Sequence, residues 1–289
     1  MKKIKLYSLA KINLTLEIIK KLPSGFHSLR SIMVKTENLQ DEIEMIFDEE
    51  KDGIKIVCDD KSIPTDEKNI CWQIAEKFFS ISKKRIGLTI KIKKKIPALA
   101  GLGGGSSNGA TVLLALNDHF GKPLNFKKLI KLADEVGKDI PVFLIPDKAV
   151  FVSGAGEKLK PLKNFPKLNL LLINPKGEIA TGWAYGELDR RMWFMTDKRR
   201  KNLSAIILKN TQNIERLSGL MHNDFSLVTE ELFPVIREIK GCLSVFGCLG
   251  ASITGKGPTV VGIFKTKKET LQMKAMLKKK YPDFFVELG

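Results

Sequence analysis

The sequence has no hydrophobic segment long enough to cross a membrane. Its longest unbroken aliphatic run extends only from Val112 to Leu116, whereas a transmembrane helix needs about 20 apolar residues. The N-terminus carries Lys2 and Lys3, but Lys5 and Lys11 interrupt the apolar core that a secretory signal peptide requires. We therefore expect a soluble, globular, cytoplasmic protein without a membrane partner.

Cysteine and histidine are scarce. The chain has 4 cysteines and 3 histidines, with no C-x-x-C pair and no histidine clustered with the cysteines. These spacings argue against a zinc site and against a disulfide framework, so free thiols are expected. No internal repeat or low-complexity tail is present. The length of 289 residues suffices for one large or two ordinary domains.

Acidic residues are few relative to basic ones. The chain has 49 Lys and Arg against 32 Asp and Glu, a formal net charge of +17. Such a charge suggests a nucleic-acid ligand, an anionic substrate such as a polyphosphate, or a lysine-rich solvated surface. Because the lysines are spread along the chain with few aromatics among them, the solvated surface is favoured and a polyphosphate substrate comes next.

The densest local signal is a glycine-rich loop. An alternating run from Leu88 to Ile96 predicts a strand before it, and residues 108–116 predict a buried helix after it. Glycine lets a ligand approach the backbone, and a helix start presents unpaired N–H groups. We therefore predict a phosphate site, with Ser106 or Ser107 as the helix cap. The predicted cradle consists of Pro97, Ala98, Leu99, Ala100, Gly101, Leu102, Gly103, Gly104, Gly105, Ser106 and Ser107.

Neither of the two commoner glycine loops is present. A G-x-G-x-x-G register starting at Gly101 puts Ser106 at its last position. Residues 250–257 are close to a P-loop, but Gly257 stands where the Mg²⁺-binding hydroxyl should be, and Pro258 and a strand-like run follow. We therefore expect phosphate binding without a Walker lysine.

In the first half of the chain, strands are followed by helices. Residues 4–19 predict a strand that places Lys11 and Asn13 on one face. Two alternating runs, 43–47 and 54–58, predict a hairpin closed by a turn at 48–53. Helices are expected at 69–81 and at 126–136, with Gly137 as C-cap, and Asp139 before Pro141 looks like another N-cap.

The pattern restarts near residues 161–166, where we place a domain boundary. A buried strand at 168–173 and a helix opening at 180–185 follow. The basic segment 192–210 is expected to be irregular and mobile, and Pro234 to kink or divide a helical stretch at 228–239. The chain should end with a strand, a glycine turn at 255–257, a strand, a helix at 268–280 and a strand at 284–288.

Three separated stretches resemble the three signatures of the GHMP kinase superfamily: residues 10–14, 97–107 and 250–257. Members of this superfamily that act on a cytidine-diphosphate-linked sugar alcohol have further motifs in a fixed order. Similar motifs stand in the same order here, at residues 25–27, 139–143 and 223–225. The resemblance covers most of the chain. It implies an α+β two-domain GHMP kinase fold, with an ATP-binding, ribosomal-protein-S5-like N-terminal domain at 1–162 and a ferredoxin-like C-terminal domain at 163–289.

The resemblance implies transfer of the γ-phosphoryl group of ATP to the 2-hydroxyl of that sugar alcohol. Asp139 corresponds to the general base, and Lys11 to the lysine that orients the hydroxyl and lowers its pKa. From the residues alone, a plain helix cap is favoured for Asp139 and a solvated strand lysine for Lys11. Mg²⁺ is expected with ATP, but its ligands are not assigned beyond Ser107 as a candidate. The oligomeric state stays open.

The remaining site residues are also assigned by resemblance. His27 would hydrogen-bond the cytosine edge, Tyr185 would stack on the ring, and Phe26 would pack beside it. A core tyrosine and a locally satisfied histidine are the ordinary alternatives. The adenosine side would include Asn69 and Lys94, and the diphosphate-sugar side Asn13 and Thr181.

Four positions depart from the usual family pattern: Phe26 replaces Tyr, Gly109 replaces Ala, Gly182 replaces Pro and Lys256 replaces Ser. Lys256 adds a cation beside a glycine turn, where it either tightens anion binding or points to solvent. Two other functions stay open: a GHMP kinase acting on homoserine or mevalonate, which His27 and Tyr185 argue against, and a basic nucleic-acid-binding protein.

Overall fold

The computed structural model describes residues 1–191, 203–209 and 211–289, and it divides into two compact units. Unit 1 comprises Met1–Ala10, Leu39–Ala98 and Gly103–Pro146, and unit 2 comprises Lys11–Asn38, Leu99–Leu102 and Asp147–Gly289. The first two strands, β1 (Lys2–Lys21) and β2 (His27–Asp48), contribute residues to both units. The units do not follow the expected division at residues 162 and 163, and those family-domain limits stay a prediction.

The sheet of unit 1 corrects the expected hairpin. The strands β2 and β3 (Ile54–Cys58) form at the predicted places, but β4 (Gly87–Lys93) lies between them. Ile90 of β4 is opposite Met45 in an antiparallel pair and opposite Ile56 in a parallel pair. The inward side chains of β4 are almost fully buried, whereas β3 buries only Ile56. The more apolar strand therefore takes the central position and β3 the edge.

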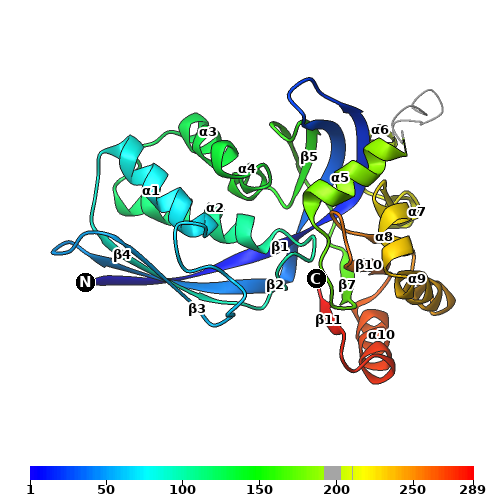
Figure 1. Ribbon diagram of the computed structural model, residues 1–289. Coiled ribbons are helices and arrows are strands. Elements are labelled where there is room, and N and C mark those ends of the chain that lie inside the picture. Colours follow the sequence, from blue (N-terminus) through cyan, green and yellow to red (C-terminus); the bar gives the residue numbers. More distant parts are fainter. Residues whose placement is uncertain (192–202, 210) are drawn as a thin grey trace. The chain divides into compact units, whose positions relative to one another are not determined.

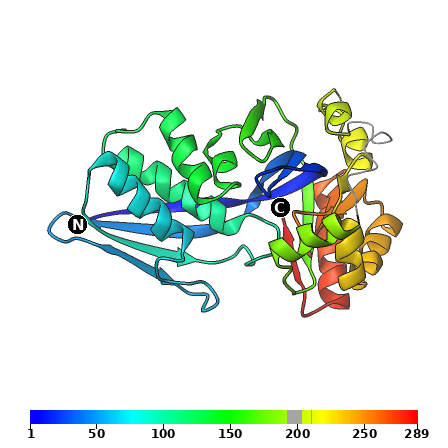
Figure 2. The ribbon, with the colours of Figure 1, turned by 45° about the horizontal axis from the view of Figure 1, so that its top comes forward.

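Four helices cover this part of the sheet, and they lie on one side of it in both ribbon views (Figures 1 and 2). Their apolar faces share a core with the strands, in which Phe47, Phe78, Ile90 and Leu113 are among the buried residues. The predicted helices at 69–81 and 126–136 are confirmed within a residue. The four are α1 (Ile70–Ser82), α2 (Gly104–His119), α3 (Phe126–Val136) and α4 (Ile140–Leu144).

Unit 2 contains an antiparallel four-stranded sheet in the order β11-β7-β10-β9. Two helices, α9 (Val235–Val245) and α10 (Lys267–Lys280), pack against it and share a core that includes Phe225 and Phe264. The predicted end of the chain, including its glycine turn, is confirmed. The strands are β7 (Asn169–Asn174), β9 (Gly250–Ile253), β10 (Val260–Phe264) and β11 (Phe285–Leu288).

Three shorter strands extend the parts of β1 and β2 that lie in unit 2. The strand β5 (Ala149–Gly154) joins β2 to β6 (Lys158–Leu162), and β8 (His222–Asn223) runs parallel to β1. Through β8, the Asn223–Phe225 stretch is fixed against β1: Asp224 accepts a hydrogen bond from Ile18 N at 2.7 Å.

The helices of unit 2 follow the predicted breaks. α5 (Thr181–Arg190) begins where the sequence places it, and Pro234 separates α8 (Ser226–Leu232) from α9. In the segment 192–210, residues 192–202 and 210 lie outside the described chain, but Leu203–Leu208 forms α6, where irregular structure was expected. α7 (Ile214–Gly219) follows. Among the described residues, no helix is long and apolar enough to span a bilayer.

Candidate functional site

Parts of the three signature stretches meet in unit 2. The ammonium of Lys11 donates to Asn13 Oδ1 at 2.8 Å and to the carbonyl oxygen of Gly101 at 3.0 Å. The Thr254 hydroxyl lies 3.2 Å from each of the same two oxygens. Gly255 N also donates to Asn13 Oδ1, at 3.0 Å. One amide oxygen thus links residues from the first, second and third signatures.

This network is buried and closely packed. Lys11 and Asn13 are 3% and 1% exposed, and a buried ammonium must be compensated by hydrogen-bond acceptors. A Cβ on Gly101 would lie 2.2 Å from the Thr254 carbonyl oxygen, so only glycine fits there. The Asn13 amide nitrogen donates to Ser31 Oγ at 2.8 Å. Asn13 therefore positions Lys11, and its contact with a substrate stays a prediction.

The second part of the glycine loop begins helix α2 in unit 1. Its N-cap is Gly103, in the left-handed region with φ 70°, and no side chain caps the helix. Ser106 and Ser107 lie in the first helical turn, so the expectation that one of them is the cap was wrong. The first helical hydrogen bond runs from Ser107 N to Gly103 O. The N–H groups of residues 104–106 therefore have no partner within the helix, the arrangement that suits an anion.

Lys94, expected on the adenosine side, forms an ion pair with the fully buried Asp41. The same carboxylate accepts from Ile96 N at 2.8 Å and from the Asn108 side chain at 3.0 Å. A Cβ on Gly104 would lie 3.1 Å from Lys94 Nζ. Asp41 thus fixes both the segment before the loop and the helix after it. Sequence reasoning missed Asp41, because nothing in the alternating run around it marks a buried acid.

Asn69 is the N-cap of α1, which gives it a structural role. Its side chain accepts from Cys71 N at 2.8 Å and donates to the Pro64 carbonyl at 2.7 Å. A buried cap of this kind stabilises the helix start. The part expected for Asn69 near adenosine stays a prediction.

Asp139 immediately precedes α4, as the sequence predicts, but its carboxylate makes no capping hydrogen bond to that helix. The predicted N-cap position is therefore confirmed, although without a side-chain capping bond, and the role of Asp139 as a base stays a prediction. Gly137 ends α3 by donating to Ala133 O, in an extended conformation. Asp139 belongs to unit 1 and Lys11 to unit 2, and their pairing stays a prediction.

The residues expected to hold cytosine are grouped in unit 2. His27 stacks on Tyr185 with ring centroids 4.6 Å apart, and Tyr185 meets Phe225 edge-on. His27 Nε2 lies 2.6 Å from Asp189 Oδ1, and this acid on α5 is a second residue that sequence reasoning missed. Phe26 is 54% exposed, and its place beside the cytosine stays a prediction.

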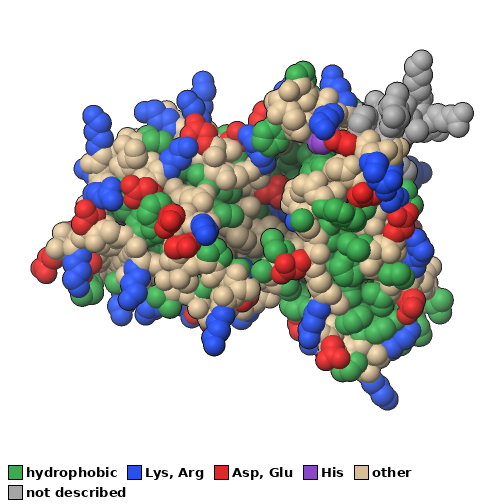
Figure 3. Space-filling model, viewed as in Figure 1, with side chains coloured by type: hydrophobic (Ala, Val, Ile, Leu, Met, Phe, Trp, Pro, Cys, Tyr) green, Lys and Arg blue, Asp and Glu red, His purple; other side chains and the backbone are tan. Residues whose placement is uncertain are grey.

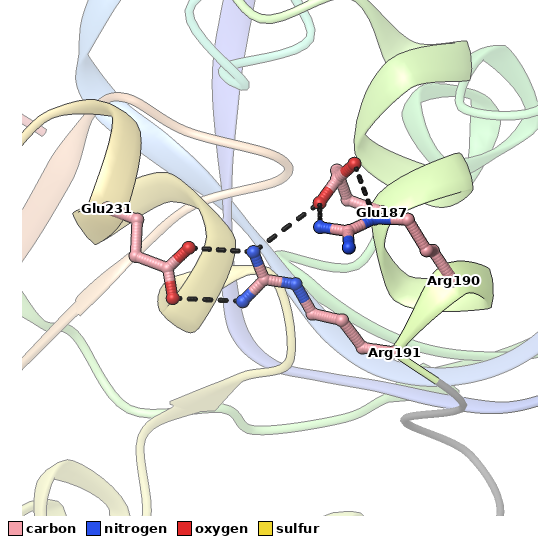
Figure 4. Close-up of polar contacts among 4 residues, drawn as sticks. All are labelled: Glu187, Arg190, Arg191 and Glu231. Carbon is pink, nitrogen blue, oxygen red and sulfur yellow. Dashed lines mark hydrogen bonds and ion pairs between the residues drawn. The ribbon is translucent and has the colours of Figure 1, made fainter.

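An ion-pair network holds the end of α5 against α8 (Figure 4). The Arg191 guanidinium bonds both oxygens of Glu231, at 2.9 and 2.7 Å, and approaches Glu187 at 3.4 Å. Arg190 bonds Glu187 from the same helix. These contacts fix the helix that carries Thr181, Tyr185 and Asp189.

Within the described chain, no three His, Cys, Asp or Glu residues form a group that could hold a metal ion. The four cysteines are free thiols, and burial raises the pKa of Cys71 to about 12. A thiol with so high a pKa is not a nucleophile at neutral pH.

Two family models match the chain: the GHMP kinases N terminal domain over residues 69–145 and the GHMP kinases C terminal domain over residues 202–283. A 4-diphosphocytidyl-2-C-methyl-D-erythritol kinase from Geobacter sp. (strain M21) is 36% identical over 91% of this chain and 90% of its own. The chain belongs to the GHMP kinase family. A kinase of the same name from Caldicellulosiruptor saccharolyticus is 38% identical over 93% and 91% of the two chains.

Solved structures place this GHMP kinase within the family fold. A 4-(cytidine 5'-diphospho)-2C-methyl-D-erythritol kinase matches with a TM-score of 0.75 at 23% identity, covering 99% of this chain and 98% of the other. A homoserine kinase from Cytophaga hutchinsonii also reaches 0.75, at 20% identity, covering 100% and 94%. Such distant likenesses show the shared α+β fold and do not separate one substrate from another.

Proposed function

We propose that this GHMP kinase transfers the γ-phosphoryl group of ATP to the 2-hydroxyl of 4-diphosphocytidyl-2-C-methyl-D-erythritol, a step of isoprenoid precursor biosynthesis. The observation that carries the proposal is the Asn13-centred network, in which all three GHMP signatures meet around the Lys11 ammonium. The relatives at 33–38% identity bear this substrate's name. Its cytoplasmic location is part of the proposal.

The loop and the start of α2 would hold the phosphates of ATP. Phosphoryl transfer depends mainly on positioning and charge stabilisation, and the N–H groups of residues 104–106 are free of bonds within the helix for that purpose. Mg²⁺ would accompany the nucleotide. It takes most of its oxygen ligands from phosphates and water, so a single hydroxyl in the first turn, such as that of Ser107, fits the proposal.

Lys11 and Asp139 would activate the acceptor. Lys11, held by Asn13 and Gly101, would orient the acceptor hydroxyl. Asp139, at the start of α4, would accept the hydroxyl proton as the bond to phosphorus forms. The leaving group is ADP.

The stacked pair of His27 and Tyr185 supports a cytidine ligand. Imidazole and phenol groups can form hydrogen bonds with the edge of a base, and aromatic rings can stack on its face. A nucleic-acid ligand is less well supported: on the visible face, Lys and Arg side chains are interspersed with acidic ones, without a continuous basic patch (Figure 3).

The direct test is ADP release with a panel of acceptor alcohols. We expect turnover with 4-diphosphocytidyl-2-C-methyl-D-erythritol and at most a trace with homoserine or mevalonate. Turnover with homoserine or mevalonate, and none with the cytidine-linked alcohol, would refute the proposed substrate and leave the kinase assignment standing.

A Tyr185→Ala variant tests the cytidine side. We expect it to lose about 1–3 kcal/mol of binding to the cytidine-linked substrate, the range found for base stacking on aromatic side chains. ATP affinity should be unchanged. Because Tyr185 also packs on Phe225, a Tyr185→Phe variant serves as the control and should keep most of the affinity. Equal losses for substrate and ATP would mean that Tyr185 only supports the fold.

A further inference from the structure

The third signature carries a lysine where the family usually has serine, and its side chain is partly enclosed. Lys256 lies in the turn between β9 and β10 and is half-buried. Its Nζ donates to Thr181 Oγ1 at 2.7 Å. Burial lowers its pKa, and the charge of Glu178 opposes this without cancelling it. The ammonium is thus partly desolvated, and its hydrogen bond to the described residues is to a neutral hydroxyl.

The backbone that presents Lys256 is fixed on several sides. Thr229 Oγ1 donates to the Lys256 carbonyl at 2.9 Å, and Gly257 N donates to Thr254 O at 2.9 Å. A Cβ on Gly257 would lie 2.7 Å from Thr229 Cγ2. Thr254 is itself a member of the Asn13 network. Lys256 is therefore held in a defined place, unlike a lysine on a solvated surface.

The charge of Lys256 also sits where a helix disfavours a cation. Its partner Thr181 is the first residue of α5, a helix with no acidic residue in its first turn and no side-chain cap at Ala180. The start of a helix is electropositive and favours anions. A second positive group there is unfavourable unless an anion lies nearby, and the charge of Glu178 compensates Lys256 only in part. The position of Lys256 is thus better suited to a bound ligand than to the protein alone.

The position of Thr181 relative to Tyr185 along α5 indicates which anion would bind beside Lys256. Tyr185 is four residues after Thr181, so the two side chains share a face about 6 Å apart along the helix axis. Tyr185 stacks on His27, the pair to which the proposed function assigns the cytosine. We propose that Lys256, together with Thr181, binds the diphosphate group of the cytidine-linked substrate. This inference rests on the proposed function for the identity of the base.

Binding of cytidine diphosphate and of cytidine separates the diphosphate from the base. For Lys256→Ser, which introduces the usual family residue, we expect calorimetry to show about 10-fold weaker binding of cytidine diphosphate, the loss typical of one charge-assisted hydrogen bond. Cytidine and ATP affinities should not change. Lys256→Arg should keep most of the affinity, and Lys163→Ser, which removes an exposed lysine of unit 2, should have no effect.

Two outcomes would overturn the inference. Equal losses for cytidine diphosphate and cytidine would make Lys256 a support for α5, and unchanged affinity for both would make it a surface lysine. The proposed function is judged separately, by turnover of the wild-type protein. A wild type that turns over the cytidine-linked alcohol while Lys256→Ser binds cytidine diphosphate normally would refute only the role of Lys256.

Discussion

Asp189 connects two side chains on the cytidine side of the site. One carboxylate oxygen lies 2.6 Å from His27 Nε2, and the other accepts from Lys21 Nζ at 2.6 Å. Burial alone would raise the pKa of Asp189, but the hydrogen bonds from Lys21 and His27 outweigh it and hold the pKa below its ordinary value. The ionised carboxylate therefore fixes the orientation of the His27 ring that stacks on Tyr185.

The lowered pKa of Asp189 predicts how the free energy of unfolding depends on pH. Since the folded-state pKa is below the unfolded value of about 3.9, the ionised form stabilises the fold above that pH. The contribution is lost as the pH falls through the lower folded value. We expect the difference in unfolding free energy between wild type and Asp189→Asn to shrink as the pH falls below about 4, where Asp189 becomes protonated.

Denaturant unfolding over this pH range provides the measurement. Asp283→Asn, at an exposed acid of unit 2, is the control and should give a small difference at every pH. A difference for Asp189→Asn that persists unchanged into acid would show that the carboxylate's charge has no part in it.

Among the elements, α2 combines a ligand-binding start with close packing. A Cβ on Gly104 would lie 3.0 Å from Ile96 Cγ2, and one on Gly109 would lie 2.7 Å from Ile70 Cγ2. The family departure at Gly109 is thus explained by the close approach of α1. Gly105 is different: it is exposed, and a Cβ there meets only the end of the Ile70 side chain, at 3.3 Å.

Gly105→Val should therefore test the phosphate cradle with little effect on packing. We expect ATP affinity to fall at least about 10-fold, because a branched side chain would stand beside the N–H groups of the first turn. Gly104→Val should also destabilise the fold, by about 1–3 kcal/mol for overpacking. Calorimetry with ATP and melting temperatures distinguish the two.

The control for Gly105→Val is Gly241→Val on α9, where a Cβ would meet nothing within 4 Å. It introduces the same residue into a helix away from the proposed cradle and should leave ATP affinity unchanged. Normal ATP binding by a folded Gly105→Val protein would mean that the start of α2 is not the cradle.

The contact between helices α5 and α8 leads to a second prediction about the packing of secondary-structure elements. Arg191 and Glu231 form a two-pronged ion pair whose side chains are 24% and 47% exposed, so solvent weakens it. A double-mutant cycle with Arg191→Gln and Glu231→Gln should give a coupling of about 0.3–1 kcal/mol. The same cycle on Lys122 and Asp118, 74% and 68% exposed, should give a coupling near zero. Equal couplings would mean that the α5–α8 pair is an ordinary surface pair.

Sequence patterns located these elements better than they paired them. Alternation identified β2 and β3, and Pro234 divided α8 from α9, because both signals are local. The partner of β3 is not local, because β4 follows only after α1. No residue in the turn between β2 and β3 indicates that β3 pairs with β4. The helix start was also misjudged, because a left-handed Gly103 can begin α2 without any capping side chain.

For the whole molecule, the resemblance succeeded where periodicity could not. Asn13 binds Thr254 and Gly255 across more than two hundred residues, a separation that no local pattern spans. The three GHMP signatures assigned these stretches to one site, because each stretch resembles a motif of the same family. The buried acids Asp41 and Asp189 belong to no quoted motif, so only the coordinates identify their partners.

The two proposed catalytic residues are tested by Asp139→Asn, Lys11→Met and the double variant. Asparagine keeps the size of Asp139 and caps a helix about as well as aspartate does. We therefore expect a near-normal melting temperature and a turnover reduced by about 10²–10⁴-fold, the usual value of general-base assistance. Lys11→Met should also reduce turnover, and it should lower stability because Asn13 and Gly101 lose a buried donor.

If the two residues act together, their effects will not add. Once Asp139 is replaced, a further Lys11→Met change should cost much less turnover than it does in the wild type, because residues that act as a unit are non-additive. Turnover, substrate affinity and melting temperature of all three variants give the measurement. Fully additive losses would assign Lys11 a role independent of the base. Near-normal turnover in a folded Asp139→Asn protein would remove Asp139 from the mechanism.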